Sequence, residues 1–171
     1  MQVETRETAG SRSRAEAGKY LTFLLAGEYF GLGILRVQEI IGMMPVTKVP
    51  RSPEFVRGVI NLRGRIIPVM DLRRKFGDES QDDTERTCII VVQVQDEDSR
   101  LTIGLLVDEV SEVINVQEEQ IEPPPSFGTR VDADFILGIG KVGEKVVILL
   151  DVDRVLTNHE ANLIGEVAER L

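Results

Sequence analysis

The chain has 171 residues, with 20 lysines and arginines against 29 aspartates and glutamates, so its formal net charge is −9. A chain this acidic repels phosphate backbones and anionic lipid surfaces at long range, which disfavours nucleic acid and membranes as partners. Hydrophobic residues make up 42% of the chain, enough for one compact domain or two small joined halves, but no apolar run approaches the roughly 20 residues of a membrane-crossing helix.

Residues 1–18 contain almost no apolar side chain to bury, and we expect them to form a flexible tail because little offsets the entropy of ordering them. They lack the apolar stretch that a secretory signal requires. Cys88 is the single cysteine, so it cannot form an internal disulfide, and it begins an apolar run at residues 88–92 as a small buried residue would. Together these features predict a cytoplasmic protein.

Two β-hairpins are predicted along the chain. The mostly apolar segment 20–26 is followed by a turn at residues 27–28 and by residues 30–34, in which apolar side chains alternate with glycine. The second hairpin joins the apolar run 88–94 to the alternating segment 101–107 across a polar turn.

Two further apolar runs, at residues 66–70 and 146–150, each end in an aspartate. We expect Asp71 and Asp151 to be N-caps of short helical segments, because a carboxylate can accept the unpaired N–H groups of a first helical turn. A longer helix is predicted at residues 158–171, where apolar side chains recur at helical spacing after a capping asparagine.

The sequence repeats itself. Segment 55–76 aligns with segment 135–156 without a gap, and the apolar positions of the first meet apolar positions of the second. Segment 37–41 aligns in the same way with segment 110–114, and the extra length of the second half falls in the loop 123–129. Each half offers about five short strands, and we predict a mainly β fold of two pseudo-symmetric barrels, which close to remove exposed sheet edges. The repeat does not determine whether strands are exchanged between the halves.

Residues suited to catalysis or metal binding are scarce. His159 is the only histidine and Cys88 the only thiol, so neither a Ser-His-Asp triad nor a zinc site is predicted. No phosphate-binding glycine loop occurs in the sequence. We therefore predict no catalytic residue, no bound metal and no cofactor. The alternative is an enzyme or small-ligand sensor in which Asp108, Glu109 and Asp132 converge between the barrels.

The two halves differ at one predicted hairpin tip. Residues 61–65 place Arg63 before Gly64, whereas residues 141–145 contain no arginine. Gly64 can adopt the positive φ that such a tip needs, which would leave Arg63 projecting outward with five donors for the carboxylates or carbonyls of a partner. A merely solvated side chain is the alternative for an exposed arginine of this kind.

Three segments carry the most specific motifs of the chain. They are residues 34–40 (Ile-Leu-Arg-Val-Gln-Glu-Ile), residues 55–64, which end in Gly-Val-Ile-Asn-Leu-Arg-Gly, and residues 67–72, which contain Pro-Val-Met-Asp-Leu. The chain resembles the CheW-type coupling proteins of bacterial chemotaxis in these segments. The resemblance spans about residues 19–156 and implies two five-stranded SH3-like barrels that share a core, together with short helices.

The resemblance also implies a domain organisation and a role. The implied CheW-like domain covers 19–157, with repeat halves at roughly 19–80 and 86–157, between the flexible tail predicted at 1–18 and the C-terminal helix predicted at 158–171. Proteins of this type bridge methyl-accepting chemoreceptors to the regulatory domain of the histidine kinase CheA, and they catalyse nothing. The implied location is the cytoplasm, at receptor arrays on the inner face of the membrane, through protein partners and without membrane insertion.

Site residues are carried over from the resemblance one by one. Glu39 and Arg63 match the acidic and basic positions that the family uses for receptor and kinase contacts. A plain solvated carboxylate is an alternative for Glu39, because Glu112 occupies the matching place in the second half. The same motifs add Asn61 and Leu62, and the stretches that line the implied receptor groove add Val37, Ile40 and Gly58, for which core positions are an alternative. Candidates for kinase contact at an apolar barrel end are Leu101, Ile103 and Gly104.

Overall fold

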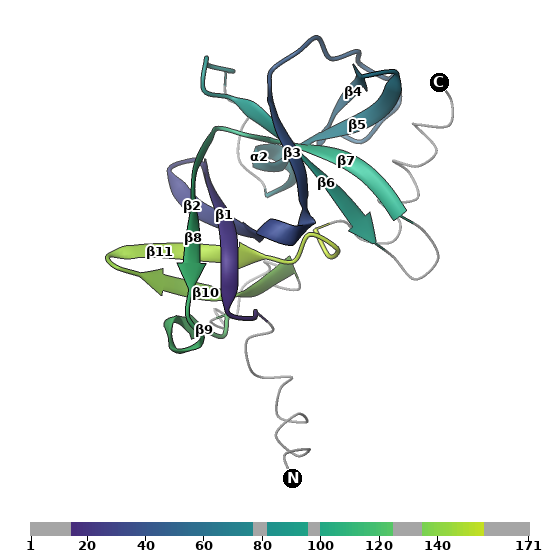
Figure 1. The fold of residues 1–171 in the computed structure, drawn as a ribbon. Coiled ribbons are helices and arrows are strands. Elements are labelled where there is room, and N and C mark those ends of the chain that lie inside the picture. The colour runs from purple at the N-terminus through teal and green to yellow at the C-terminus, as the bar shows by residue number, and fades with distance from the viewer. Residues whose placement is uncertain (1–14, 77–81, 96–99, 125–134, 156–171) are drawn as a thin grey trace.

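The computed structural model describes residues 15–76, 82–95, 100–124 and 135–155, which form two packed β-sheets (Figure 1). The strands are β1 (Gly18–Leu25), β2 (Glu28–Gly33), β3 (Val37–Gly42), β4 (Val56–Leu62), β5 (Arg65–Asp71), β6 (Cys88–Gln95), β7 (Arg100–Val107), β8 (Glu109–Val116), β9 (Ile121–Glu122), β10 (Ile136–Val142) and β11 (Lys145–Leu150). The six-stranded sheet has the order β8-β1-β2-β11-β10-β9, and the five-stranded sheet has the order β3-β6-β7-β5-β4. The predicted mainly β class is confirmed.

Each sheet contains a hairpin from the other half of the sequence. The first-half hairpin β1–β2 lies in the six-stranded sheet (Figure 1), where β2 pairs parallel with β11. The second-half hairpin β6–β7 lies in the five-stranded sheet, where β7 pairs parallel with β5. Strands are therefore exchanged between the halves, which answers the question that the repeat alone leaves open.

The internal repeat is visible in the strand pairing. Ile60 pairs with Ile67 between β4 and β5, and the equivalent residues of the second half, Gly140 and Val147, pair between β10 and β11. The register irregularity near the start of β4 recurs at the same place in β10. The duplication inferred from the sequence is thus confirmed in the backbone pairing.

In each sheet the chain leaves an edge strand and returns to the opposite side of the same sheet. The edge strands that it leaves are β3 and β8. After β3 the chain bends back, and Thr47 exchanges two backbone hydrogen bonds of 2.8 Å with Val59 of β4. After β8, the short helix η3 (Glu118–Gln120) leads into β9, which pairs with β10. This returning strand is the reason that one sheet has six strands instead of the predicted five. The returning segment thereby covers the edge of β4 in one sheet and of β10 in the other.

The three larger apolar clusters of the described residues lie between the sheets and on their two outer faces. The largest cluster fills the space between the sheets and takes Leu21, Phe23 and Leu32 from the six-stranded sheet and Ile90 and Leu105 from the five-stranded sheet. On its opposite face the five-stranded sheet packs Ile60, Ile67, Val69, Ile89, Val91 and Leu106. The opposite face of the six-stranded sheet packs Tyr20, Val116, Val147 and Leu149. Burial of each such side chain contributes about 1.5–3 kcal/mol, so the shared cluster holds the two sheets firmly together.

The carboxylate predicted to cap the segment after β5 does so. Asp71 accepts the backbone N–H of Arg73 at 3.0 Å at the start of the helix α2 (Leu72–Lys75). Asp151 likewise accepts the N–H of Asp153 at 3.0 Å. Residues 152–155 nevertheless form a turn, so the prediction of a helical segment directly after Asp151 is wrong as far as residue 155.

Two predicted segments fall largely outside the described residues. These are the tail at 1–18, of which the structure describes residues 15–18, and the helix at 158–171. β1 begins at Gly18, one residue before the predicted start of the folded domain. Across the ranges that the structure describes, no helix is long and apolar enough to cross a membrane.

An ion pair joins the sheets where the chain passes from β2 to β3. Arg36, at the end of the short helix η2 (Ile34–Arg36), donates from Nη1 to Oδ2 of Asp153 at 2.9 Å. Burial opposes ionisation of Asp153, but the hydrogen bonds from Arg36 and from the N–H of Gln95 outweigh it, so the pKa of this carboxyl lies below its ordinary value. Folding therefore favours the charged form of Asp153.

This shift predicts a pH-dependent contribution to stability. Because the pKa of Asp153 is lower in the folded than in the unfolded chain, the contact stabilises the fold above the unfolded-state pKa of about 3.9 and is lost as the pH falls through the lower folded-state value. We expect Asp153→Asn to lower the free energy of unfolding at about pH 7 and to have much less effect at about pH 2. Urea unfolding of both proteins at the two pH values measures this, and equal differences would contradict the assignment.

Candidate functional site

The tip of the β4–β5 hairpin presents Arg63 to solvent. Arg63 and Gly64 have φ values of +53° and +88°, and two consecutive positive values are typical of the type I′ turn that suits the twist of a hairpin. Asn61 supports the turn, because its Oδ1 accepts the N–H of Gly64 at 2.8 Å. The Arg63 side chain is 69% exposed. The expectation that Arg63 projects outward is confirmed, and its role in binding stays a prediction.

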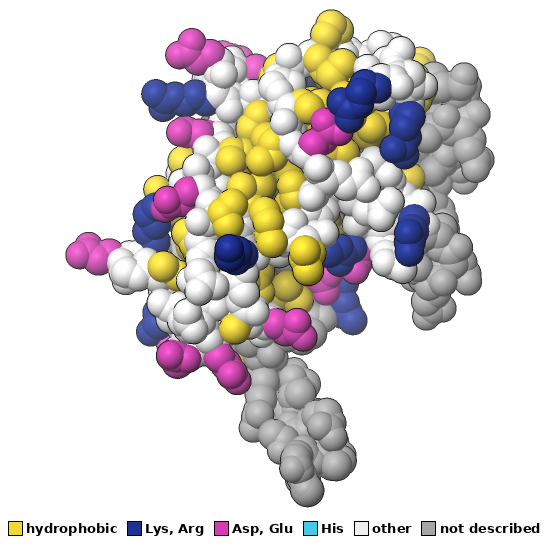
Figure 2. Space-filling view, viewed as in Figure 1, with side chains coloured by type: hydrophobic (Ala, Val, Ile, Leu, Met, Phe, Trp, Pro, Cys, Tyr) yellow, Lys and Arg dark blue, Asp and Glu magenta, His cyan; other side chains and the backbone are white. Residues whose placement is uncertain are grey.

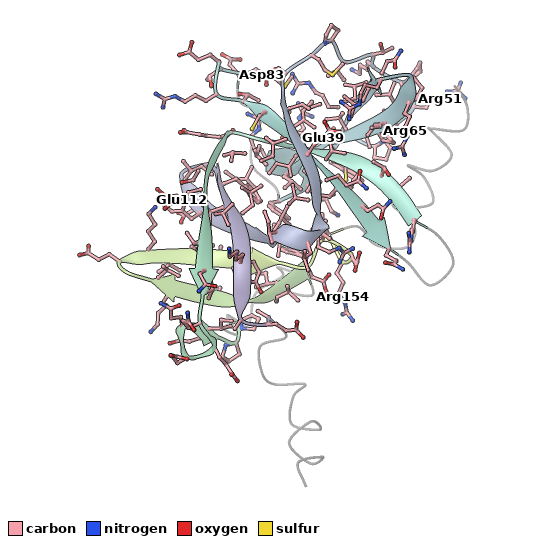
Figure 3. The ribbon with its side chains drawn as sticks, viewed as in Figure 1. Glu39, Arg51, Arg65, Asp83, Glu112 and Arg154 are labelled. Atoms are coloured by element: carbon pink, nitrogen blue, oxygen red, sulfur yellow. The ribbon has the colours of Figure 1, made fainter. Side chains whose placement is uncertain are left out.

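Arg63 pairs with Glu39, which lies on β3 at the edge of the five-stranded sheet (Figure 3). A guanidinium N–H of Arg63 donates to Oε2 of Glu39. The sequence predicts both charges as contacts for partners and does not indicate that they contact each other. With 69% of the Arg63 side chain and 31% of the Glu39 side chain exposed, the pair contributes little to stability, roughly 0–1 kcal/mol. Both charges therefore stay accessible to a partner.

Apolar side chains are exposed beside this pair. Ile40, the neighbour of Glu39 on β3, is 44% exposed, and Val113 on β8 is 49% exposed. The two residues occupy equivalent places in the repeat. Figure 2 shows apolar side chains gathered on the side of the molecule that β3 and β8 present, and Figure 3 shows Glu39 and Glu112 on these two strands. We call Glu39, Ile40, Arg63 and Val113 together the β3–β8 face.

Other predicted groove residues lie deeper. Val37 is half-buried and packs against the core between the sheets, and Leu62 is half-buried at the end of β4. Gly58 is buried in β4 with a φ of +149°, and a Cβ there would overlap the carbonyl of Thr47 and lie 2.8 Å from Cγ1 of Val46. The glycine therefore allows the segment after β3 to lie against β4. Direct contact of these residues with a partner stays a prediction.

The three candidates for kinase contact lie on β7, in the middle of the five-stranded sheet between β6 and β5. Ile103 is fully buried, and a Cβ added to the buried Gly104 would lie 2.6 Å from Cγ2 of Ile89. Leu101 is half-buried near the start of the strand. Because the central strand is covered on both faces, Ile103 and Gly104 do not form the exposed apolar surface that was predicted. Only Leu101 of the three reaches solvent.

Of the acidic residues suggested for an enzyme or sensor site, the structure describes Asp108 and Glu109, and both contact other groups of the protein. Asp108 accepts hydrogen bonds from Nη1 of Arg73 at 2.9 Å and from the N–H of Ala26 at 2.8 Å. Glu109 forms a surface ion pair at 3.7 Å, and Asp132 lies outside the described residues. Within the part of the chain that the structure describes, no group of three or more His, Cys, Asp or Glu side chains is placed to hold a metal. Asp108 is therefore occupied by internal contacts.

A buried arginine escaped the sequence-based predictions. The Arg73 side chain is fully buried and donates to Asp71 from Nε at 3.0 Å and from Nη2 at 3.1 Å, as well as to Asp108. Burial lowers the pKa of Arg73, but the hydrogen bonds and charges of Asp71 and Asp108 raise it by more, so the guanidinium stays charged. Its place two residues after a capping aspartate is the only sequence signal. In the second half the residue two places after the capping Asp151 is Asp153, so the repeat does not reinforce that signal.

Most of the folded chain corresponds to one known family, because residues 19–160 match the CheW-like domain. The chain belongs to the CheW-like family. The chemotaxis protein CheW of Klebsiella aerogenes is 38% identical over 151 residues, which cover 88% of this chain and 89% of that protein. The chemotaxis protein CheW of Bacillus subtilis is 32% identical over 144 residues, which cover 84% of this chain and 89% of that protein. The crystal structure of the scaffolding protein TtCheW from Thermoanaerobacter tengcongensis matches with a TM-score of 0.75 at 38% identity, over 85% of this chain and 96% of that chain.

The CheW-like domain includes all of the strands described above. The match begins at residue 19, inside β1, and extends past the end of β11 at Leu150. The resemblance predicted from three short motif segments is thus confirmed over the whole folded region. The β3–β8 face lies within this domain, on strands from both halves of the repeat.

Proposed function

We propose that this protein is a non-enzymatic scaffold of chemotaxis that couples methyl-accepting chemoreceptors to the histidine kinase CheA. Family membership supports this role, since relatives that are 38% and 32% identical are named chemotaxis protein CheW. The observation that carries the proposal is the β3–β8 face, where an accessible ion pair borders exposed apolar side chains. Charged and apolar groups combined in this way are typical of protein-binding surfaces.

On this proposal the chemoreceptor binds at the β3–β8 face. Ile40 and Val113 supply apolar area, and Arg63 can exchange the carboxylate of Glu39 for carboxylates or carbonyls of the receptor. An interface of standard size buries about 800 Å² on each partner, and a few residues provide most of its binding energy. We expect Arg63 to be one of these, because arginine is enriched among such residues and this one stands on a defined turn.

The regulatory domain of the kinase would bind at a different surface, with Leu101 on β7 as a candidate contact. Each sheet and the segment that returns to its edge would correspond to an SH3-like barrel, so receptor and kinase would dock on a rigid pair of barrels with a common core. The protein would then work in the cytoplasm, at receptor arrays on the inner face of the membrane, where its partners hold it.

Arg63→Ala is expected to weaken binding to the cytoplasmic fragment of a chemoreceptor by about tenfold, or ~1.4 kcal/mol, a loss ordinary for an anchor residue. The free energy of unfolding should change by less than about 0.5 kcal/mol, because the side chain is exposed and its ion pair lies on the surface. Isothermal titration calorimetry against the receptor fragment and urea unfolding measure the two quantities.

Lys141→Ala is the matched control. Lys141 lies on β10, at the place that corresponds to Asn61 in the repeat, and its Nζ is 2.7 Å from Glu122, with 58% and 56% of the two side chains exposed. The change removes a surface cation from the second half and should leave the dissociation constant for the receptor fragment within about twofold. If Arg63→Ala binds the receptor fragment as tightly as the unmodified protein, the β3–β8 face is not the receptor-docking site.

A further inference from the structure

Within the described residues the chain passes between the two sheets twice. It leaves the six-stranded sheet after β2 and enters the five-stranded sheet at β3, through η2. It returns after β7 and enters β8 directly after Asp108. An arginine–aspartate ion pair lies at each passage.

At the first passage, Arg36 contacts residues of both sheets. Its Nη1 and Nη2 donate to the two carboxylate oxygens of Asp153, at 2.9 and 2.5 Å, and Asp153 follows β11 of the six-stranded sheet. Nη2 also donates to the carbonyl of Gln93 on β6 of the five-stranded sheet, at 2.9 Å. Oδ1 of Asp153 accepts the N–H of Gln95, at the end of β6, at 2.8 Å. We call these contacts the Arg36 clamp.

At the second passage the charges are reversed. Here the aspartate stands on the passage, and Oδ1 of Asp108 accepts from Nη1 of Arg73 at 2.9 Å; Arg73 follows β5 of the five-stranded sheet. Oδ2 of Asp108 accepts the N–H of Ala26, in the β1–β2 turn of the six-stranded sheet, at 2.8 Å. We call these contacts the Arg73 clamp.

The two clamps lie at neighbouring places in the repeat, since Arg36 aligns with Glu109, the residue after Asp108. Arg73 and Asp153 correspond to each other in the alignment that relates β5 to β11. In the repeat, β1 matches β6 and β8 matches β3. Superposing the β1–β8 pairing on the β6–β3 pairing places Ala26 on Gln95. In each clamp one carboxylate accepts both an arginine and a backbone N–H of the exchanged hairpin. An arginine–aspartate pair thus joins the sheets at both passages, with the charges reversed.

The clamps differ in their access to water. The Arg73 side chain is 0% exposed and that of Asp108 23%, whereas Arg36 and Asp153 are 34% and 32% exposed. Breaking a buried pair leaves an uncompensated charge in the interior, but breaking a partly exposed pair leaves groups that water can reach. The Arg36 clamp can therefore be removed without unfolding the chain.

We propose that Arg36 and Asp153 are positioning residues, whose clamp holds the start of β3 and with it the β3–β8 face. The consequence for binding rests on the proposed function, since this face is the proposed receptor site. β3 is an edge strand that begins directly after Arg36, and its pairing with β6 is irregular between Val37 and Glu39. Because β3 has a strand neighbour on one side only and its hydrogen-bond register with β6 is interrupted, the Arg36 clamp is needed to fix the start of β3. Without it, Glu39 and Ile40 must be ordered again on binding, which lowers affinity.

The test compares Arg36→Ala, Arg36→Lys and a reversed pair, Arg36→Asp with Asp153→Arg. Lysine keeps the charge without the two-pronged geometry of the guanidinium, and the reversed pair reproduces the polarity of the Arg73 clamp. Amide hydrogen exchange of residues 37–42 reports on β3 directly, with no partner present. We expect exchange there to be about tenfold faster in both single variants, to be unchanged in β4 and β5, and to be slow again in the reversed pair. Arg36→Lys preserves the comparison if Arg36→Ala does not fold.

Binding of a chemoreceptor cytoplasmic fragment is the second readout. Its affinity should fall by about tenfold in the single variants and recover in the reversed pair. If amide exchange at residues 37–42 is unchanged in Arg36→Ala and Arg36→Lys, the positioning role is wrong, whatever the affinity. It is also wrong if the reversed pair exchanges as fast at these residues as the two single variants. If the unmodified protein binds neither the receptor fragment nor the CheA regulatory domain, the proposed function fails, and hydrogen exchange still decides whether the clamp holds β3.

Discussion

Asp71→Ala is expected to lower the free energy of unfolding by about 3–5 kcal/mol, because it deprives the buried Arg73 of its main carboxylate partner. Asp71 is 2% exposed and accepts from Nε of Arg73 at 3.0 Å and from Nη2 at 3.1 Å. In the variant, Asp108 still contacts Nη1 of Arg73 at 2.9 Å and Asp83 still contacts Nη2 at 3.5 Å. Neither carboxylate contacts Nε, which loses its partner. Urea unfolding followed by circular dichroism measures the loss.

Asp151→Ala is the matched control, because Asp151 occupies the equivalent position in the second half of the repeat. Its side chain is 19% exposed, and the nearby Arg154, at 3.6 Å, is 55% exposed. The change removes one hydrogen bond to the N–H of Asp153, so a loss of about 1 kcal/mol is expected. Equal losses in the two variants would show that Arg73 does not depend on a buried partner.

Gly58→Ala is expected to lower the free energy of unfolding by about 3 kcal/mol or more, through backbone strain together with a steric clash. Gly58 has a φ of +149°, and an added Cβ would overlap the carbonyl of Thr47. Thr47 cannot move away freely, because it exchanges two backbone hydrogen bonds of 2.8 Å with Val59. Urea unfolding at neutral pH measures the effect.

Gly42→Ala provides the comparison for this glycine. Gly42 is exposed at the end of β3, and beyond its chain neighbours no heavy atom lies within 4 Å of an added Cβ. A change of less than about 0.5 kcal/mol is expected. If Gly58→Ala is tolerated equally well, the segment after β3 is not fixed against β4. If Gly58→Ala is stable but binds the receptor more weakly, Gly58 contacts the receptor directly. If Gly58→Ala is destabilised, displacement of the segment after β3 explains a loss of binding.

Much of the fold could be predicted because a repeat constrains both halves at once. Apolar alternation identified both exchanged hairpins, and the alignment of the two halves predicted that β4–β5 and β10–β11 pair alike. The exchange itself could not be predicted, because alternation determines which side of a strand is buried and not which sheet the strand joins. Leu21 and Phe23 of β1 are buried in the shared core, and their spacing carries no information about β8 as a neighbour.

The candidate site was predictable where its chemistry is local. The turn at Arg63 and Gly64 follows from the glycine, which permits the positive φ of a two-residue tip. The contact between Arg63 and Glu39 is not local in the sequence, and it depends on the packing of β3 beside the tip. Ile103 was predicted as a kinase contact from the family resemblance alone, and its alternating strand does not show whether it lies at the centre of a sheet or at its edge.

The hairpin exchange also sets the order in which the protein can be completed. β1 is synthesised early, yet it pairs with β8, with Gly18 opposite Val116, so the six-stranded sheet waits for most of the chain to leave the ribosome. Pairing over such sequence distances slows folding. The five-stranded sheet waits in turn for β6 and β7. A product truncated between the halves therefore lacks strands of both sheets and can complete neither.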